Sequence, residues 1–456
     1  MEYFAGSARL PSGWAKNVRI SVSADGLFER VEPNAEPGDA KSLGDAVLPA
    51  MPNGHSHAFQ RAMAGAAEFR AGSADNFWSW RAGMYRLAKK MDAASLYAVA
   101  HRLYVEMLKV GYTTVTEFHY LHRTGQPATP DILQGSVAPL VRAAHDAGIR
   151  LLLLPALYQR GGFDNEPLSA AQQRFAMDMR EFAALLTTLS ERQSDGFRLG
   201  MCIHSLRAVD EANMGAALAA FEEINPAGPI HIHIAEQERE VAECLKHTGM
   251  RPVEWLLDRF DVDERWCLVH ATHINDVELA ALAKTGAVIC VCPTTEANLG
   301  DGVFRAREWL NAGGRLCVGS DSNVSVSVSE ELRWLEYAQR LANRERNVLS
   351  TPEYPYVGDY LWNQAVRGGS QATGAPRSGI TAGAHADLVL VDTRHPVTHA
   401  KVEEGVLDAL VFAGNENLVN DVMVGGEWRI RSGKHERDAS SANEYAHALE
   451  GLRNEN

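Results

Sequence analysis

The stretch "DAVLPAMPNGHSH", residues 45–57, joins a short apolar run to two histidines that stand two residues apart. Such a β-rich run predicts a strand, and the chain repeats the pattern, mostly with an amphipathic helical stretch after each run. The eight runs cover residues 45–57, 111–120, 148–158, 197–205, 229–236, 265–273, 286–294 and 315–322. Eight strands alternating with helices is the number that closes a (β/α)8 barrel, so the sequence predicts an α/β fold of this TIM-like kind.

The two ends of the chain follow a different pattern. Residues 17–33 and 386–433 alternate apolar and polar side chains around the turns Asp25-Gly26 and Gly425-Gly426, which is typical of antiparallel β-structure. Because chain ends often lie close together, we expect one small β-sandwich domain built from both ends. The predicted boundaries are 1–48 with 380–436 for this domain, 49–379 for the barrel, and 437–456 for a C-terminal helix or tail.

Composition narrows the class of protein. A chain of 456 residues with 46% hydrophobic content can bury a large core, while its net charge of −14 and the lack of a basic, aromatic-rich stripe argue against nucleic acid. The N-terminus has no signal-peptide pattern, and no run of 18 apolar residues appears, so we expect neither secretion nor a membrane. Six scattered cysteines favour a reducing cytoplasm.

Residue types that bind metals follow the predicted strands. A barrel enzyme carries its active site at the carboxyl ends of its strands, so these residues should meet at one mouth. They are His55, His57, His204, His231, His233, Glu236, His270, His273 and Asp321. Residues two apart on a strand share a face, so His55 and His57 can bind the same ion. One such histidine alone is more often a core residue, but their coincidence at one end of several strands predicts a metal site.

Three points stay open on spacing alone. His231 and His233 share a face, so either can be the ligand while the other packs beneath it. Cys290 and Cys292 are a conceivable soft-metal pair, although their apolar strand favours core packing. Glu117 and His119 either face the mouth or form a polar network elsewhere.

Several motifs together resemble the amidohydrolase superfamily over nearly the whole chain: "HSH" at 55–57, "HIAE" at 233–236, "HATH" at 270–273, "GSDSN" at 319–323 and "GITAGAHADLVLVD" at 379–392. In the deaminase branch this resemblance implies one divalent metal, zinc in preference to iron, on His55, His57, His233 and Asp321. It implies proton transfer by Glu236 and His270 with help from Asp321, and it selects His233 over His231. The run "FRLGMCIHS" (197–205) has no lysine to bridge two ions, which favours a mononuclear site and disfavours hydrolases of the dihydroorotase type.

Within the superfamily, the chain is most similar to the family of formimidoylglutamate deiminases. The segments that carry this resemblance are "MPNGHSHAFQRAMAG" (51–65), "FWSWR" (77–81), "TEFHYLH" (116–122), "HSLRAV" (204–209) and "CPTTEANLGDG" (292–302). It implies hydrolysis of N-formimino-L-glutamate to N-formyl-L-glutamate and ammonia in histidine degradation, and a homodimer. The implied substrate contacts are Gln60, Arg81, Tyr120, His204 and Arg207, with the arginines on the two carboxylates of the substrate. Gly54, before the first ligand, is expected only to change backbone freedom.

Two other functions are compatible with part of this pattern. A deaminase of a ring such as guanine, cytosine or a triazine would use the same metal residues, but two arginines in the pocket argue against a neutral ring. A non-catalytic scaffold typically loses ligands, whereas every expected position is filled here.

Overall fold

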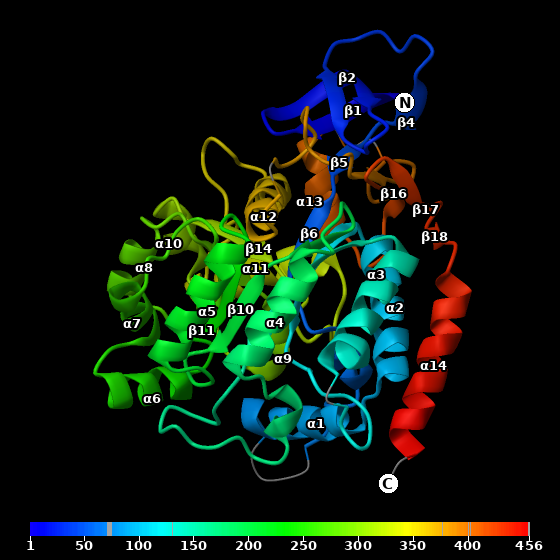
Figure 1. Cartoon of the computed structure of the whole chain (residues 1–456). Helices are drawn as coiled ribbons and strands as arrows, with labels where there is room; N and C mark the ends of the chain where they lie inside the picture. Colours follow the sequence, from blue (N-terminus) through cyan, green and yellow to red (C-terminus); the bar gives the residue numbers. More distant parts are fainter. Residues whose placement is uncertain (71–74, 130, 376, 400, 402, 455–456) are drawn as a thin grey trace.

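A closed barrel of parallel strands forms the centre of the computed structural model, which describes residues 1–70, 75–129, 131–375, 377–399, 401 and 403–454 (Figure 1). Its strands are β6 (Met51–Ser56), β7 (Tyr112–His119), β8 (Arg150–Leu157), β10 (Met201–Ser205), β11 (Ile230–Ile234), β12 (Trp266–His270), β13 (Val288–Val291) and β14 (Arg315–Val318). They pair in chain order from β6 to β14, and a parallel bridge between Ser56 and Asp321 closes the ring. The predicted (β/α)8 barrel is confirmed.

Two of the eight predicted runs are divided between elements. The run at 45–57 supplies β5 (Val47–Pro49) to a second sheet before it becomes β6 of the barrel. The run at 197–205 breaks at Gly200 into β9 (Phe197–Leu199), which pairs with β8, and β10. A Cβ at Gly200 would lie 2.4 Å from Leu154 Cδ2, so this break needs a glycine for close packing.

Helices surround the ring of strands, and aspartate side chains cap the N-termini of several of them. Asp92, Asp178 and Asp210 each accept a backbone N–H in the first turn of the helix that follows. The helices are α1 (Phe77–Lys90), α2 (Ala93–Lys109), α3 (Ala138–Ala147), α4 (Met179–Ser190), α5 (Glu211–Ile224), α6 (Glu238–Thr248), α7 (Pro252–Arg259), α8 (Asp276–Leu282), α9 (Pro293–Leu299), α10 (Ala306–Asn311), α11 (Val328–Asn343), α12 (Val357–Ala372) and α13 (Glu404–Phe412), with short turns η1 (Ala58–Met63), η2 (Leu133–Val137) and η3 (Gln172–Phe175).

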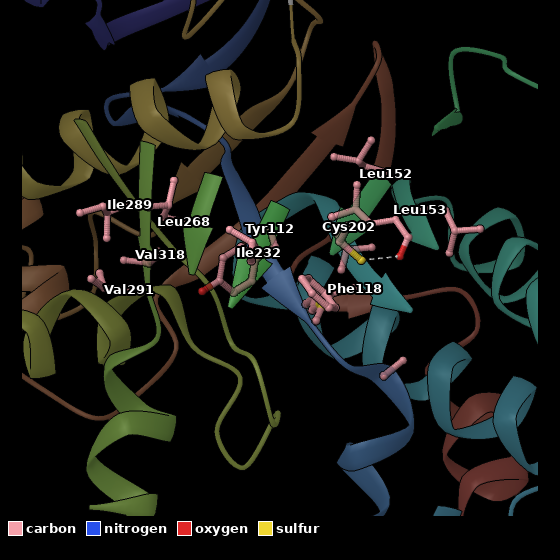
Figure 2. Close-up of a cluster of buried hydrophobic side chains, with 14 of the residues drawn as sticks. Tyr112, Phe118, Leu152, Leu153, Cys202, Ile232, Leu268, Ile289, Val291 and Val318 are labelled. Atoms are coloured by element: carbon pink, nitrogen blue, oxygen red, sulfur yellow. Dashed lines mark hydrogen bonds between the residues drawn. The ribbon is translucent and has the colours of Figure 1, made fainter. Parts of the chain in front are cut away.

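The barrel strands are buried on both faces, as a parallel sheet under helices requires. Side chains such as Ile232, Leu268 and Ile289 belong to the large cluster between strands and helices (Figure 2). In the same view, the dashed line joins Cys202 Sγ to the carbonyl oxygen of Leu154, 3.1 Å away.

A separate cluster fills the lower part of the barrel interior, which we call the barrel floor: Cys267, Val269, Val288, Cys290, Cys292, Cys317 and Ala372. The prediction that Gly54 changes only backbone freedom is wrong. Its φ is ordinary, but an added Cβ would lie 2.6 Å from Cys317 Sγ and 3.0 Å from Cys290 Sγ. Glycine is therefore needed there because the thiols of the floor occupy the space, and backbone freedom is not the cause.

The predicted small domain from both chain ends is also confirmed. Nine mostly antiparallel strands pair as one sheet in the order β18-β17-β16-β15-β5-β1-β2-β3, with β4 beside β1. The remaining strands are β1 (Glu2–Leu10), β2 (Gly13–Val22), β3 (Phe28–Glu32), β4 (Lys41–Gly44), β15 (Leu388–Val391), β16 (Val419–Val424), β17 (Glu427–Arg431) and β18 (Lys434–His435). The exact domain boundaries stay predictions.

After this sheet the chain forms α14 (Asp438–Asn454), which runs down the outside of the barrel beside α2 (Figure 1). Lys109 and Arg102 of α2 bind Asp438 at distances of 2.6 and 2.7 Å. In the part of the chain that the structure describes, no helix is both long and apolar enough to cross a membrane.

Candidate active site

Three imidazoles and one carboxylate converge at the carboxyl end of the barrel. His55 Nε2 lies 3.1 Å from His57 Nε2 and 3.1 Å from His233 Nε2. Asp321 Oδ1 lies 3.3 Å from His55 Nε2 and 3.4 Å from His57 Nε2. All four side chains are buried. Nitrogen atoms of the three histidines lie within 4.8 Å of one another, and Asp321, which forms a second such group with His270 and Cys292, approaches His55 and His57. We call these four predicted ligands the metal-ligand group.

The protonation of this group fits a bound cation. His57 Nδ1 donates to the carbonyl oxygen of Phe118 at 2.8 Å, and His233 Nδ1 donates to that of His204 at 3.0 Å. Each neutral ring therefore presents an unprotonated Nε2 to the others. Burial, and then the neighbouring His57, lower the pKa of His55 to about 3, which keeps this ring neutral as well. Lone pairs and a carboxylate facing one point repel each other, and a divalent metal removes that repulsion.

Strained backbone brings these side chains to the mouth. Asp321 has a φ of +45°, while His270 and Ala235, the residue before Glu236, have φ values of +70° and +50°. Non-glycine residues adopt this region rarely, and such strain concentrates at functional sites. The same segments close the barrel, because Asp321 N donates to His55 O and His57 N donates to Asp321 O, both at 3.0 Å. A Cβ at Gly319 would lie 2.7 Å from His55 Cβ, so this closure requires a glycine.

His270 lies beside the metal-ligand group, and Glu236 lies beside His270. His270 Nε2 lies 3.9 Å from Asp321 Oδ2 and 4.0 Å from Glu236 Oε1. Burial raises the pKa of Glu236 against the opposing charges of His270 and Arg207. Burial disfavours a charged His270, but its hydrogen bond with Glu296 and the charges of Glu236 and Asp321 outweigh burial and raise its pKa to about 10. His270 Nε2 is thus near both Asp321, a predicted ligand, and Glu236.

Four of the five residues predicted to contact substrate, Gln60, Tyr120, His204 and Arg81, form a continuous wall together with Tyr158. Gln60 Nε2 donates to the hydroxyl of Tyr120 at 2.7 Å, and the Tyr120 ring lies 4.8 Å from the His57 ring and 5.3 Å from that of His204. The wall continues from His204 to Tyr158, whose hydroxyl accepts from Arg81 Nη2 at 3.1 Å. It therefore leads from a predicted metal ligand to an arginine.

The two arginines have unused binding capacity. Among the described residues, Arg81 forms no ion pair, and the nearest carboxylate oxygen to Arg207 is that of Glu236 at 3.9 Å. Arg207 is 6% exposed, and its buried Nε has no hydrogen-bond partner in the described chain. Both arginines lie near the Trp78 ring and line a cavity of about 150 Å³. A buried guanidinium without a full partner suits an anionic ligand.

The residues that spacing left open lie outside this group. His231 packs beneath His233, and its Nε2 donates to the carbonyl oxygen of Ala372 at 2.8 Å. His273 Nε2 donates to Asp301 O at 2.9 Å. Glu117 accepts the Ala58 N–H at 2.7 Å, and His119 contacts Ser136 Oγ at 3.0 Å, so these two belong to polar networks behind the mouth.

Cys290 and Cys292 lie at different heights, Cys290 within β13 and Cys292 just after it, before α9. Cys290 packs in the barrel floor against Cys317, as expected for core packing. Cys292, two residues higher, reaches the mouth, where its Sγ lies within 4.8 Å of ligand atoms of His270 and Asp321. Both thiols thus belong to the floor cluster, and Cys292 also reaches the edge of the mouth.

Three residues of the site were missed at the sequence level. Tyr158 and Gln172 support Arg81, since the Tyr158 hydroxyl also accepts from Gln172 Nε2 at 3.0 Å. Glu296 lies 3.2 Å from His270 Nδ1. Glu296 belongs to the motif "CPTTEANLGDG", so the sequence marks its segment as part of the family resemblance. The motif alone does not reveal that Glu296 contacts His270 of β12.

Comparison with known proteins shows the family of this chain. Residues 46–429 match the amidohydrolase family, so the chain belongs to this family, whose members use a divalent metal. Residues 3–45 match the N-terminal domain of formimidoylglutamate deiminase HutF. The chain is 46% identical over 450 residues to formimidoylglutamate deiminase of Pseudomonas aeruginosa, covering 98% of each protein.

Two further proteins resemble this chain to different degrees. A crystal structure of an amidohydrolase from Brucella melitensis superimposes with a TM-score of 0.93 at 43% identity and covers 99% of both chains. The 8-oxoguanine deaminase of Pseudomonas aeruginosa is 27% identical over 402 residues, covering 85% of this chain and 82% of that protein. The ring deaminase is thus clearly more distant than the deiminase.

Proposed function

We propose that this chain hydrolyses N-formimino-L-glutamate to N-formyl-L-glutamate and ammonia, a step of histidine degradation. The observation that carries the proposal is the wall that joins the metal-ligand group to Arg81, with Arg207 beside Glu236. A linear amidine with two carboxylates needs a hydrolytic centre at one end and cationic partners at the other. Whole-length similarity to a formimidoylglutamate deiminase supports the same reaction.

We assign His55, His57, His233 and Asp321 as ligands of one divalent metal, with zinc preferred over iron. Three imidazoles and one carboxylate suit either ion, and the strand-four run supplies no lysine for a second one. When bound, such a metal lowers the pKa of water toward ~7 and so makes hydroxide available at neutral pH.

Substrate orientation is assigned to the wall and the arginines. Arg81 and Arg207 each bind one carboxylate through paired N–H groups, while Gln60, Tyr120 and His204 add neutral hydrogen bonds. The buried Gln60 Oε1 has no partner in the described chain, which leaves it free to accept from a ligand. The formimino carbon is then held over Asp321, His270 and Glu236.

Proton transfer is assigned to His270 and Glu236. His270 Nε2 takes the proton of the attacking water, and Asp321 Oδ2, 3.9 Å away, helps to orient that water. A cation on Asp321 offsets that carboxylate's charge and favours the neutral His270 that this step needs. Glu236 pairs with the amidinium nitrogens as a carboxylate. It then takes the hydroxyl proton of the tetrahedral adduct and passes it to the departing nitrogen, so that the formyl C=O forms and ammonia leaves in place of an amide anion.

The setting of the enzyme is part of the proposal. We place it in the cytoplasm as a homodimer acting on a small dicarboxylate, with no nucleic acid or membrane partner. The six free, buried cysteines agree with a reducing compartment.

Ammonia release from N-formimino-L-glutamate tests the proposed function. The purified chain should release ammonia, lose this activity on complete removal of metal, and regain it with one equivalent of zinc. Full activity without metal, or a requirement for two equivalents, would overturn the mononuclear hydrolytic site. Faster turnover of guanine or cytosine would replace the proposed substrate by a ring.

A further inference from the structure

Glu296 is a buried carboxylate next to the site that the mechanism above does not use. It lies in the first turn of α9, is 5% exposed, and its Oε1 faces His270 Nδ1 at 3.2 Å. The same oxygen accepts the Cys292 N–H at 2.9 Å, so the carboxylate is itself held in place. Because a carboxylate only accepts, the proton on His270 must lie on Nδ1 in the neutral ring.

This contact directs the other ring nitrogen. With Nδ1–H bound to Glu296, His270 Nε2 carries the lone pair, and this atom faces Asp321 Oδ2 and Glu236 Oε1. Unlike the rings of His57 and His233, which bind backbone carbonyls, the His270 ring has no backbone partner among the described residues. A side-chain partner is therefore needed to hold both the orientation and the tautomer.

The first turn of α9 is anchored independently on either side of Glu296. Thr294 N and Oγ1 donate to the buried Glu331 of α11 at 3.0 and 2.5 Å. Thr295 Oγ1 lies 2.9 Å from Ser322 Oγ, in the residue next to Asp321. This turn thus links the segments of His270 and Asp321 and gives Glu296 a fixed position.

We infer that Glu296 is a positioning residue, which holds His270 with its Nε2 lone pair directed at the attacking water. The inference rests on the proposed function for its role in turnover, although the contact itself does not. Glu296 touches neither the metal-ligand group nor the substrate wall in the described chain, so it should act through His270 alone.

A double-mutant cycle in the zinc-loaded enzyme tests this role. Glu296→Met keeps the length of the side chain but removes the acceptor, and it should lower kcat by about 10- to 100-fold with little change in KM or zinc content. Glu296→Gln keeps an acceptor and should lose less. In the His270→Asn background, Glu296→Met should have no further effect, because a residue that acts through His270 has nothing left to orient.

Glu331→Gln is the matched control, since Glu331 is a buried carboxylate that anchors α9 without contacting His270. Any loss it causes should persist in the His270→Asn background. If Glu296→Met lowers the activity of His270→Asn by the same factor as that of the wild type, Glu296 has only a structural role and the inference is wrong.

An activity-free measurement separates this inference from the proposed function. In the zinc-loaded protein with ¹⁵N-labelled histidine, the hydrogen-bonded imidazole Nδ1–H of His270 should give a downfield proton signal, assigned by its loss in His270→Asn. The signal should disappear in Glu296→Met. Its persistence there would overturn the inference even in an active enzyme, whereas a chain that releases no ammonia yet shows this loss would overturn only the proposed function.

Discussion

His231 and His233 stand on the same strand and the same face, yet they lie in different layers of the barrel interior. The upper residue joins three other ligand-type side chains, while the lower one donates to Ala372 O above a floor of thiols and aliphatic groups. Two strands further on, Cys290 and Cys292 both belong to the floor cluster, but only the higher one, Cys292, also reaches the mouth. Height along the strand therefore decides whether a polar residue serves the site or the packing.

The sharpest test of this comparison is to remove each histidine in turn. His233→Ala should empty the metal site and abolish turnover, since it deletes one of four ligands. His231→Ala should keep the metal and mainly lower stability, by about 1 to 3 kcal/mol, because Ala372 O loses its donor. Elemental analysis and thermal unfolding of both variants measure this, and loss of metal from His231→Ala alone would reverse the assignment.

A smaller effect is expected inside the upper layer, where ligands and proton carriers differ. His270→Asn and Glu236→Gln should each lower kcat roughly 10²- to 10⁴-fold while the metal content stays near that of the wild type. The cause is loss of proton transfer rather than loss of ligation. Steady-state kinetics with metal analysis on the same samples checks it, and an emptied site would make either residue a ligand.

A third test concerns Arg81 and Arg207, which are assigned to the two carboxylates of the substrate. A substrate that lacks one carboxylate leaves a guanidinium unpaired, which costs at least ~2 to 3 kcal/mol, or roughly 30- to 150-fold in kcat/KM. N-formiminoglycine and an α-amide of the substrate probe the two carboxylates. Arg81→Met and Arg207→Met should each lower the activity on the full substrate and remove the preference for one carboxylate only.

The kcat/KM values of the two truncated substrates are the control. If both truncated substrates react as fast as N-formimino-L-glutamate, no dicarboxylate pocket exists, and the ring-deaminase alternative gains support.

The smallest expected change lies in the floor. Gly54→Ala forces a Cβ against Cys317 Sγ and should lower the free energy of unfolding by about 1 to 3 kcal/mol. Gly196→Ala is the matched control, because a Cβ there meets no atom within 4 Å, and it should be nearly neutral. Chemical denaturation compares the two, and equal stability of both variants would show that the floor yields to accommodate the methyl group.

The sequence predicted most of the fold because apolar strand runs and helical periodicity are local signals. It also placed His55 with His57, since spacing along one strand is local. It did not reveal Glu296, Tyr158 or Gln172, because each acts on a residue that is distant in the chain: His270 for the first and Arg81 for the other two. Spacing alone left His231 and His233 open, and the family resemblance selected His233. The physical reason is the contact of His231 with Ala372, 141 residues away, which spacing does not show.

The identity of the organic product tests the central claim most directly. Water can add to the formimino carbon of N-formimino-L-glutamate and then expel either of two nitrogens. Because Glu236 lies 4.0 Å from His270, which adjoins Asp321, while the glutamate carboxylates are assigned to Arg81 and Arg207, the account predicts loss of the terminal nitrogen. NMR of the reaction mixture should show N-formyl-L-glutamate and ammonia in equal amounts. Glutamate with formamide, or no reaction alongside turnover of a ring amine, would contradict the account.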